Sequence, residues 1–257
     1  MTSASRASTS NTTKRRFGPA VRSAASTLAG FSIAGPNART LLQRLVRDDL
    51  SPDAFRFFQV RETAVGFAPA ILARAGFTGE LGYEIWTTPD YLATLYDDLW
   101  DAGRELGLMH FGGRALSSLR LEKGYGSFNK DFRPDYTAAE TGLDRFIDFS
   151  KPEFTGRGAA LAERTAGPKR RFVVFEVDAS DAEVIGYESI MKDDAAVGYV
   201  TSGAYGHCVG KSLAAGYVPL ALARDGARFE IDILGEMRAA TVRLAPLYDP
   251  QGLRLRS

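Results

Sequence analysis

The sequence has 257 residues, of which 45% are hydrophobic and 25% are charged, and these fractions are typical of a soluble globular protein. Its 32 basic and 31 acidic residues nearly cancel, which argues against a nucleic-acid partner because nucleic-acid-binding surfaces normally carry a basic excess. The single cysteine, Cys208, excludes an intrachain disulfide and favours a cytoplasmic location, and no apolar run approaches the ~18–20 residues that span a membrane.

The chain begins with the segment MTSASRASTSNTTKRR, which is rich in Ser and Thr and carries basic but no acidic side chains. This composition predicts a disordered tail over residues 1–27. A transit peptide has a similar composition, but no amphipathic stretch or apolar secretory core accompanies this one. Folded sequence is therefore expected from near Leu28.

Residues 28–166 are predicted to form an α+β domain. Gly35-Pro36 starts a helix whose apolar residues, from Ala38 to Val46, fall at helical spacing. Short strands are predicted over residues 70–75 and 83–87, on either side of a Gly-rich connection. Further helices are predicted after Thr88-Pro89, over residues 113–123 with Gly124 as C-cap, and over residues 156–164.

Strands dominate after Gly167-Pro168, which we interpret as a linker between domains. Alternating or β-rich runs predict strands over residues 171–178, 197–201, 212–218, 229–234 and 237–244. Short strands at regular spacing indicate an antiparallel barrel or a jelly roll in residues 167–257. The predicted fold class is thus α+β followed by a small all-β domain.

The run FTGELGYE, from Phe77 to Glu84, combines a tight Gly-rich turn with a carboxylate on the strand that follows. A carboxylate in such a position can accept two parallel hydrogen bonds from a planar donor pair, such as the amino-pyrimidinone edge of a pterin. The residues alone favour a simpler interpretation of Glu84, as a solvent-facing strand residue that pairs with a basic side chain.

A second run, RLEKGY, covers residues 120–125 and closes the predicted helix over residues 113–123. Together with the first run it resembles the glycine-cleavage T-protein (aminomethyltransferase) family, and it is closest to the C-terminal folate-binding domains of dimethylglycine and sarcosine dehydrogenases. Weaker matches follow in the expected order, in residues 129–143, 198–203 and 216–218. The resemblance covers most of the chain from Leu28 onward.

This resemblance favours the interpretation of Glu84 as a ligand over that of a solvent-facing strand residue. It implies that Glu84 holds the pterin of tetrahydrofolate. Phe77 stands where the family usually has tyrosine, so its ring can still pack on the folate while a hydroxyl contact is lost. Tyr83 and Arg114 are predicted as further folate-binding residues. Arg114 lies two positions before the family's folate-contacting arginine, and a surface arginine is an equally good interpretation of it.

Other polar residues are predicted to be structural. Arg120 and Glu122 are interpreted as internal ion-pair partners, and Asp131 and Glu140 as loop and cap residues. Gly210-Lys211-Ser212 lacks the earlier glycine of a phosphate loop, because Tyr205 stands there. His207 and Cys208 are interpreted as a barrel-loop histidine and a packed cysteine, and no metal site is predicted because His110 is the only other histidine.

The resemblance implies transfer of a one-carbon unit from an amine donor to tetrahydrofolate, and it makes a flavoprotein dehydrogenase a possible partner. The family's catalytic aspartate belongs to a region before the segment that corresponds to Phe31–Pro36, and no residue here matches it. No catalytic residue is therefore predicted, the chain is interpreted as N-terminally shortened, and no FAD site is expected on it. The alternative is a non-catalytic folate-binding module or fragment.

Overall fold

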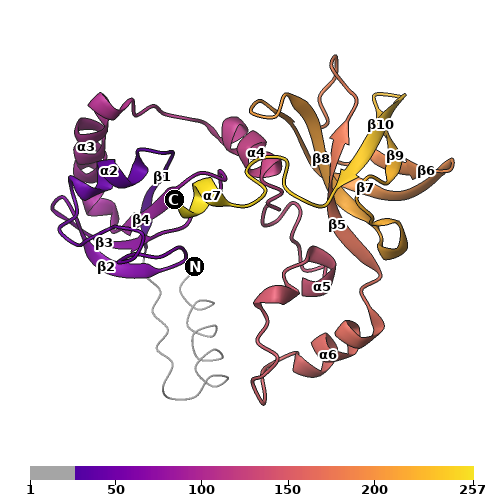
Figure 1. Cartoon of the computed structure of the whole chain (residues 1–257), viewed down its shortest axis with the longest axis horizontal. Coiled ribbons are helices and arrows are strands. Elements are labelled where there is room, and N and C mark those ends of the chain that lie inside the picture. The colour runs from indigo at the N-terminus through magenta and orange to yellow at the C-terminus, as the bar shows by residue number, and fades with distance from the viewer. Residues whose placement is uncertain (1–26) are drawn as a thin grey trace, which may run out of the picture.

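The computed structural model describes residues 27–257, so the tail predicted over residues 1–27 lies outside the described residues except for Thr27. The described chain forms two lobes (Figure 1). We call strands β1–β4 with helices α2 and α3 the sheet lobe, and strands β5–β10 with helices α4–α6 the barrel lobe. Helix α4 packs on strands β7 and β8, on the side of the barrel lobe that faces the sheet lobe, and the chain returns to the sheet lobe at its C-terminus.

The sheet lobe is an antiparallel four-stranded sheet in the order β1-β4-β3-β2. Its elements are β1 (Ala29–Ala34), α2 (Ala38–Gln43), β2 (Val60–Val65), β3 (Ala68–Ala73), β4 (Gly82–Thr87) and α3 (Leu92–Gly103), with 3-10 turns at Pro89–Tyr91 and Arg104–Leu106. The two helices and the strands β3 and β4 agree with the sequence predictions. Strands β1 and β2 were not predicted, and they supply the two edges of the sheet.

One face of this sheet packs on α2 and α3. Successive strand residues point to opposite faces, so Ile33, Leu72 and Ile85 enter the core while their neighbours do not. Leu41 of α2 and Leu95 of α3 cover them from the helices. The opposite face carries exposed residues, and it is the face on which the predicted ligand Glu84 lies.

The barrel lobe is a closed antiparallel barrel of six strands in the order β10-β5-β8-β7-β6-β9. The strands are β5 (Arg170–Val177), β6 (Ser189–Lys192), β7 (Ala195–Gly206), β8 (Lys211–Pro219), β9 (Arg228–Ile233) and β10 (Glu236–Arg243). This confirms the predicted all-β C-terminal part and selects the barrel over the jelly roll. Strand β6 was not predicted. Closure leaves no free sheet edge in this lobe.

Four short helices connect and flank the lobes: α4 (Gly113–Glu122), α5 (Ala138–Thr141), α6 (Arg157–Ala166) and α7 (Leu253–Arg256), with 3-10 turns at Asp144–Phe146 and Leu220–Leu222. Gly124 follows α4 with a φ of 71°, as its predicted capping role requires. Helix α7 docks on the sheet lobe, where the buried guanidinium of Arg74 donates to the backbone oxygens of Arg256 and Ser257, each at 2.8 Å.

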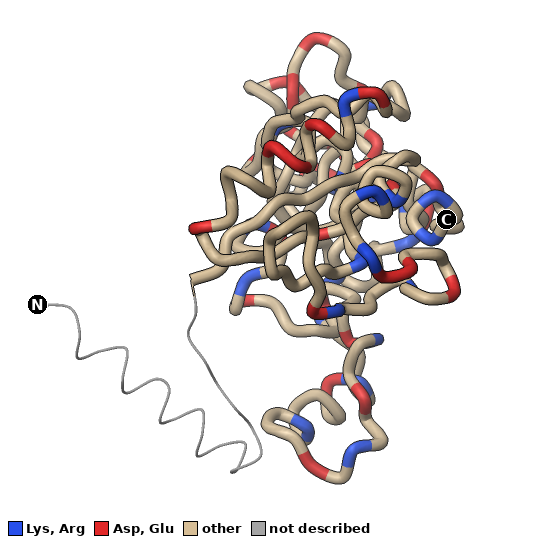
Figure 2. The backbone as a smooth tube through the Cα atoms, turned by 90° about the vertical axis from the view of Figure 1, so that its left-hand side faces the viewer, with Lys and Arg blue, Asp and Glu red and all other residues tan. Residues whose placement is uncertain are grey.

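Acidic and basic positions are interspersed over the side of the molecule seen in Figure 2, in keeping with the near-zero net charge. Basic positions gather around the C-terminus in that view. Within residues 27–257, every helix is too short or too polar to cross a membrane.

Candidate functional site

Glu84 lies at the centre of the accessible sheet face. In the register of the sheet it is level with Ser32 of β1 on one side and with Ala73 of β3 on the other, and Val60 of β2 continues the row. Because the side chains of Ser32 and Ala73 are small, they do not cover the Glu84 carboxylate. Its Oε2 accepts a hydrogen bond from the indole of Trp86 at 3.3 Å, while no donor within residues 27–257 contacts Oε1.

Tyr83 lies on the opposite face of β4 and is fully buried. Its ring stacks on Phe55 at a centroid distance of 6.2 Å, and its hydroxyl accepts a hydrogen bond from Nε of Arg39 at 3.2 Å. A side chain with no exposed surface on the far side of the sheet cannot share a ligand with Glu84. The structure therefore argues against the predicted ligand role of Tyr83 and makes it a core residue.

The Gly-rich connection before β4, residues 76–82, is here called the signature loop. Phe77 leaves this loop towards the barrel lobe and stacks on Tyr125, with nearly parallel rings 5.9 Å apart. Gly79 has a φ of 83°, and a Cβ built on it would lie 3.1 Å from Cδ of Lys123. Glycine is therefore required at position 79 for two reasons: the backbone has a positive φ, and the Lys123 side chain at the end of α4 occupies the space that a Cβ would need.

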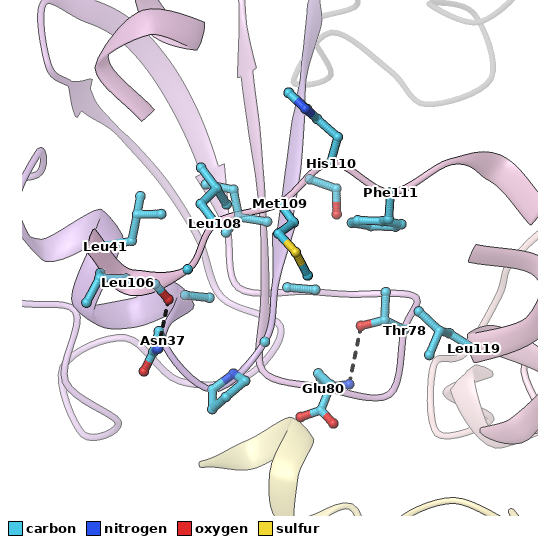
Figure 3. A pocket seen from close by; sticks show the side chains of 17 residues that line it. Asn37, Leu41, Thr78, Glu80, Leu106, Leu108, Met109, His110, Phe111 and Leu119 are labelled. Atoms are coloured by element: carbon cyan, nitrogen blue, oxygen red, sulfur yellow. Dashed lines mark hydrogen bonds between the residues drawn. The ribbon is translucent and has the colours of Figure 1, made fainter. Parts of the chain in front are cut away.

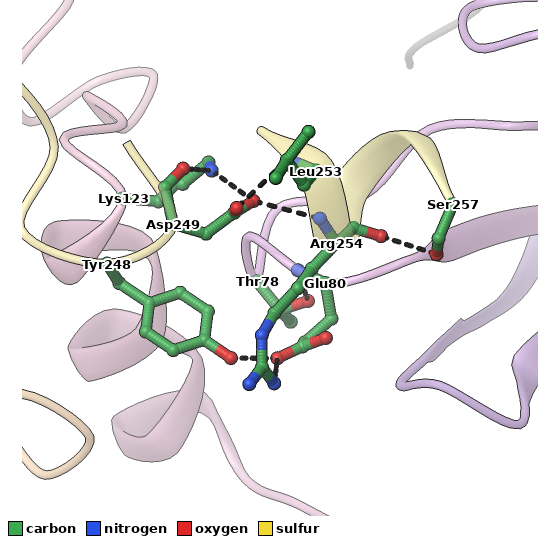
Figure 4. A network of polar contacts seen from close by, with 8 residues as sticks. All are labelled: Thr78, Glu80, Lys123, Tyr248, Asp249, Leu253, Arg254 and Ser257. Atoms are coloured by element: carbon green, nitrogen blue, oxygen red, sulfur yellow. Dashed lines mark hydrogen bonds and ion pairs between the residues drawn. The ribbon is translucent and has the colours of Figure 1, made fainter. Parts of the chain in front are cut away.

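A network of polar contacts ties the signature loop to the C-terminal segment (Figure 4). The Glu80 carboxylate accepts hydrogen bonds from the hydroxyl of Tyr248 and from Nη1 of Arg254, the latter at 3.2 Å. Beside it, the buried Lys123 ammonium donates to Oδ2 of Asp249 at 2.9 Å. Sequence reasoning assigned no role to Glu80, although it lies inside the signature run.

The pKa values of two groups in this network are shifted. Burial, reinforced by the hydrogen bond to Glu80, raises the pKa of Tyr248 to about 12. Burial alone would raise the pKa of Asp249, but hydrogen bonds from Lys123 and from the backbone amides of Leu253 and Arg254 outweigh it and lower that pKa. Both shifts favour the hydrogen-bonded form seen in the structure, so this network holds the loop rather than donating or accepting protons.

A pocket of about 440 Å³ opens beside the signature loop (Figure 3). Its walls are strand β1, the turn that leads into α2, and the connection from α3 to α4, from which Met109 points into the pocket. Thr78 and Glu80 line it from the signature loop, whereas Glu84 and Phe77 do not. The signature run therefore contributes to two neighbouring features, the sheet face with Glu84 and this pocket.

Arg114 is the second residue of α4 and projects into solvent, with 92% of its side chain exposed. Its guanidinium pairs with the carboxylate of Glu183 from the barrel lobe at 2.9 Å. This arrangement agrees with the alternative interpretation of Arg114 as a surface residue and does not bring it to the sheet face of Glu84.

The polar residues predicted to be structural lie in the interior. Arg120 pairs with the fully buried Asp131 at 2.5 Å, and Thr201 of β7 donates to the second oxygen of that carboxylate. Glu140 forms a capping box at the start of α5, as predicted. The prediction for Glu122 was wrong in its partner, because its Oε1 accepts from the backbone amides of Cys208 and Val209 and not from a basic side chain.

The remaining predicted features lie at the β7–β8 turn. His207 and Cys208 occupy this turn, and Cys208 is exposed, so its predicted packing in the interior was wrong. Lys211 opens strand β8, in agreement with the rejection of a phosphate loop. Among the described residues, no group of three or more His, Cys, Asp or Glu side chains is placed to hold a metal ion.

Comparisons with known proteins agree with this architecture. The family described as "GCVT N-terminal domain" matches residues 2–151, and the "Glycine cleavage T-protein C-terminal barrel domain" matches residues 170–249. Dimethylglycine dehydrogenase from Rattus norvegicus is 36% identical over 237 residues, which are 92% of this chain and 28% of that protein. An aminomethyltransferase from Caldanaerobacter subterraneus is 31% identical, over 84% of this chain and 57% of that protein.

The crystal structure of glycine cleavage system aminomethyltransferase T from Bartonella henselae superposes with a TM-score of 0.82 and 26% identity. That match covers 96% of this chain and 66% of the solved chain, so this chain spans only part of each relative. The two family matches account for both lobes in the observed order. The chain therefore belongs to the glycine-cleavage T-protein family.

Proposed function

We propose that this chain is the folate-binding part of a tetrahydrofolate-dependent aminomethyl, or one-carbon, transferase. The observation that carries the proposal is the position of Glu84. It is a half-buried carboxylate on a central strand, with one oxygen held by Trp86 and the other without a donor within residues 27–257. A half-buried carboxylate whose second oxygen has no protein donor within these residues is available to a ligand that supplies one.

The chemistry of this acceptor fits a pterin. The amino-pyrimidinone edge of tetrahydrofolate presents planar N–H donors, and a carboxylate held on a strand is the matching acceptor. In this proposal Glu84 binds and orients the pterin, and the stacked rings of Phe77 and Tyr125 offer an apolar surface beside the signature loop for the remainder of the folate. Arg114 and Tyr83 are left out of the proposed site.

Bound tetrahydrofolate would supply the nucleophilic nitrogen that accepts the one-carbon unit. The residues of this chain would orient that nitrogen and exclude water, which lowers the entropic cost of the transfer. The amine donor would come from a flavoprotein dehydrogenase, in line with the dehydrogenase relatives, and be an aminomethyl adduct or an iminium.

A second candidate is a folate-binding module without transferase activity. The two consecutive aspartates near α2, Asp48 and Asp49, favour it because of where their contacts place them. Asp48 accepts from the hydroxyl of Thr63 at 2.6 Å, and Asp49 accepts from the amide and hydroxyl of Ser51 at 2.8 and 3.0 Å. Thr63 lies on the sheet face opposite to Glu84, and Ser51 lies in the connection between α2 and β2, so neither aspartate is placed beside a ligand held at Glu84.

Calorimetric titration with tetrahydrofolate tests the shared part of both candidates. We expect Glu84→Ala to weaken binding by on the order of 10- to 100-fold, because two hydrogen bonds to a charged acceptor are lost. Glu62→Ala is the matched control, since Glu62 is an exposed carboxylate of β2 on the same sheet face. Equal affinity of the wild type and Glu84→Ala would refute the role of Glu84.

Turnover separates the two candidates. Formation of methylenetetrahydrofolate is measured with formaldehyde, or with the iminium produced by sarcosine oxidation, in the wild type and in Glu84→Ala. Turnover that falls with the affinity in Glu84→Ala supports the transferase. Saturable binding without turnover supports the binding module, and absence of saturable binding contradicts both.

A further inference from the structure

A second cavity opens where the end of α4 meets strand β5 and the segment that follows β10. Its volume is about 200 Å³, and none of the described residues that line it is acidic. Engineered cavities of roughly 150 Å³ hold one benzene ring, so this cavity has room for a short dicarboxylate. We call it the basic cavity, after four of its lining side chains: Lys123, Arg145, Arg171 and Arg243.

Two of these four cations already have carboxylate partners. The Lys123 ammonium pairs with Asp249 at 2.9 Å, and the Arg243 guanidinium pairs with Glu176 at 2.8 Å. Both pairs are made within the protein, so these two cations serve the walls of the basic cavity.

The other two cations lack such partners. Arg145 and Arg171 are exposed, and neither makes an ion pair or a side-chain hydrogen bond within residues 27–257. The Arg145 guanidinium lies over the ring of Phe146, 4.9 Å from its centroid, and this contact leaves its N–H groups available as donors. The basic cavity therefore offers two guanidinium groups to an anion.

The basic cavity adjoins the aromatic surface proposed above for the folate. Tyr125 lines the cavity, and its ring stacks on Phe77 of the signature loop with the centroids 5.9 Å apart. Burial raises the pKa of Tyr125, and the positive charge of Arg145 opposes that rise, as expected for a guanidinium near the phenol. A ligand that crosses the stacked rings from the signature loop thus reaches the cavity.

The chemistry of tetrahydrofolate supplies a matching anion. The molecule ends in a glutamate with two carboxylates, and a guanidinium fork is a favoured partner of a carboxylate because its N–H groups match the two oxygens. Arg114, the sequence-predicted candidate for this role, is paired with Glu183 and lies away from the sheet face. Arg145 and Arg171 are better placed, since they line a cavity beside Tyr125 and lack a carboxylate.

We propose that the basic cavity binds the glutamate carboxylates of tetrahydrofolate through Arg145 and Arg171. The inference rests on the proposed function, because it continues the ligand held at Glu84 past the rings of Phe77 and Tyr125. A free dicarboxylate shares the same chemistry, and the experiment distinguishes the two.

Calorimetric titration compares tetrahydrofolate with 6-methyltetrahydropterin, which keeps the pterin and lacks the p-aminobenzoylglutamate. Arg145→Gln and Arg171→Gln should each weaken tetrahydrofolate binding by about three- to tenfold, because each removes one partly solvated charge pair. Affinity for 6-methyltetrahydropterin should stay within about twofold of that of the wild type. Arg114→Gln is the matched control, an exposed arginine outside the cavity that should bind both ligands as the wild type does.

Urea denaturation of the double variant, Arg145→Gln with Arg171→Gln, checks that both exposed substitutions leave the fold intact. Equal affinity of the wild type and the folded double variant for tetrahydrofolate overturns the inference. The same loss of affinity for 6-methyltetrahydropterin as for tetrahydrofolate also overturns it, because the arginines would then act on the pterin.

The compound p-aminobenzoylglutamate carries the carboxylates without the pterin, and it separates this inference from the proposed function. Saturable binding that is lost in the double variant and kept in Glu84→Ala supports the basic cavity, whatever tetrahydrofolate does at Glu84. Tetrahydrofolate binding that depends on Glu84 but not on the two arginines overturns the inference and leaves the proposed function in place. Glutarate that binds as tightly as p-aminobenzoylglutamate would make the cavity a site for free dicarboxylates and contradict the assignment to folate.

Discussion

In the barrel lobe the buried carboxylate of Asp131 is bound on both oxygens, by Arg120 and by Thr201. In the sheet lobe Glu84 is half-buried, and only one of its oxygens has a protein donor within residues 27–257. The two carboxylates thus illustrate two uses of a polar group in one chain. A fully satisfied buried group contributes to stability and specificity of the fold, whereas a partly satisfied group on an accessible face is available to a ligand.

The two lobes also differ in how far the edges and faces of their sheets are covered. The barrel closes on itself, so none of its strands presents a free sheet edge. The sheet covers one face with α2 and α3 and leaves the other accessible, with Trp86 and Val60 exposed on it. The signature loop lies at the junction of the lobes, where Glu80 and Lys123 connect it to the C-terminal segment.

The largest effect is expected from Asp131→Ala, which leaves the Arg120 guanidinium buried without its partner. We expect the free energy of unfolding to fall by about 3–5 kcal/mol in urea denaturation. Asp135→Ala removes a solvent-exposed partner of Arg133 and should cost less than about 1 kcal/mol. A loss below about 1 kcal/mol in Asp131→Ala would mean that the barrel lobe does not depend on this pair.

Gly79→Ala tests the packing of the signature loop against Lys123 at the junction of the two lobes. The added methyl group meets Lys123 and the residue must keep a positive φ, so we expect a loss of about 2 kcal/mol in the free energy of unfolding. Gly107→Ala is the control, because Gly107 has a φ of 75° with nothing within 4 Å of the added Cβ. It carries the conformational cost alone, of about 1 kcal/mol. Equal losses of unfolding free energy in the two variants would show that the contact with Lys123 does not contribute to the cost.

Tyr248→Phe tests the hydrogen bond by which the Tyr248 hydroxyl holds Glu80 of the signature loop. The effect of this substitution on stability depends on pH. The folded-state pKa of Tyr248, about 12, lies above the ordinary tyrosine value of 10.0, so its contribution to stability is complete below pH 10 and is lost as pH rises towards 12. We expect Tyr248→Phe to cost about 1 kcal/mol at neutral pH and to flatten the decline in stability above pH 10. Stability profiles of the two proteins that remain parallel between pH 9 and 12 would contradict this.

The smallest expected effect on stability is that of Glu84→Gln, because the side chain is isosteric and has few partners. The free energy of unfolding should change by less than about 0.5 kcal/mol, while the affinity for tetrahydrofolate falls. The two measurements, urea denaturation and calorimetry, are made on the same sample. A loss of stability as large as that in Asp131→Ala would place Glu84 among the structural residues and end the contrast between the lobes.

Much of the fold could be predicted from local signals in the sequence. Helices α3 and α4 have clear apolar periodicity and recognisable ends, and alternation in the last 90 or so residues indicates a strand-rich domain. The short strands β1, β2 and β6 were missed, because each has only four to six residues and mixes small or charged side chains with apolar ones. Such strands are stabilised by their neighbours in the sheet more than by their own composition.

The candidate site was predicted less completely than the fold. By itself the sequence determined the Gly-rich signature loop and the strand that follows it with Glu84. Only the tertiary structure decided that the helices cover the face of Tyr83, that Arg114 pairs with Glu183, and that Tyr248 holds Glu80. These outcomes depend on contacts between residues 69 to 168 positions apart, which local periodicity and spacing do not encode.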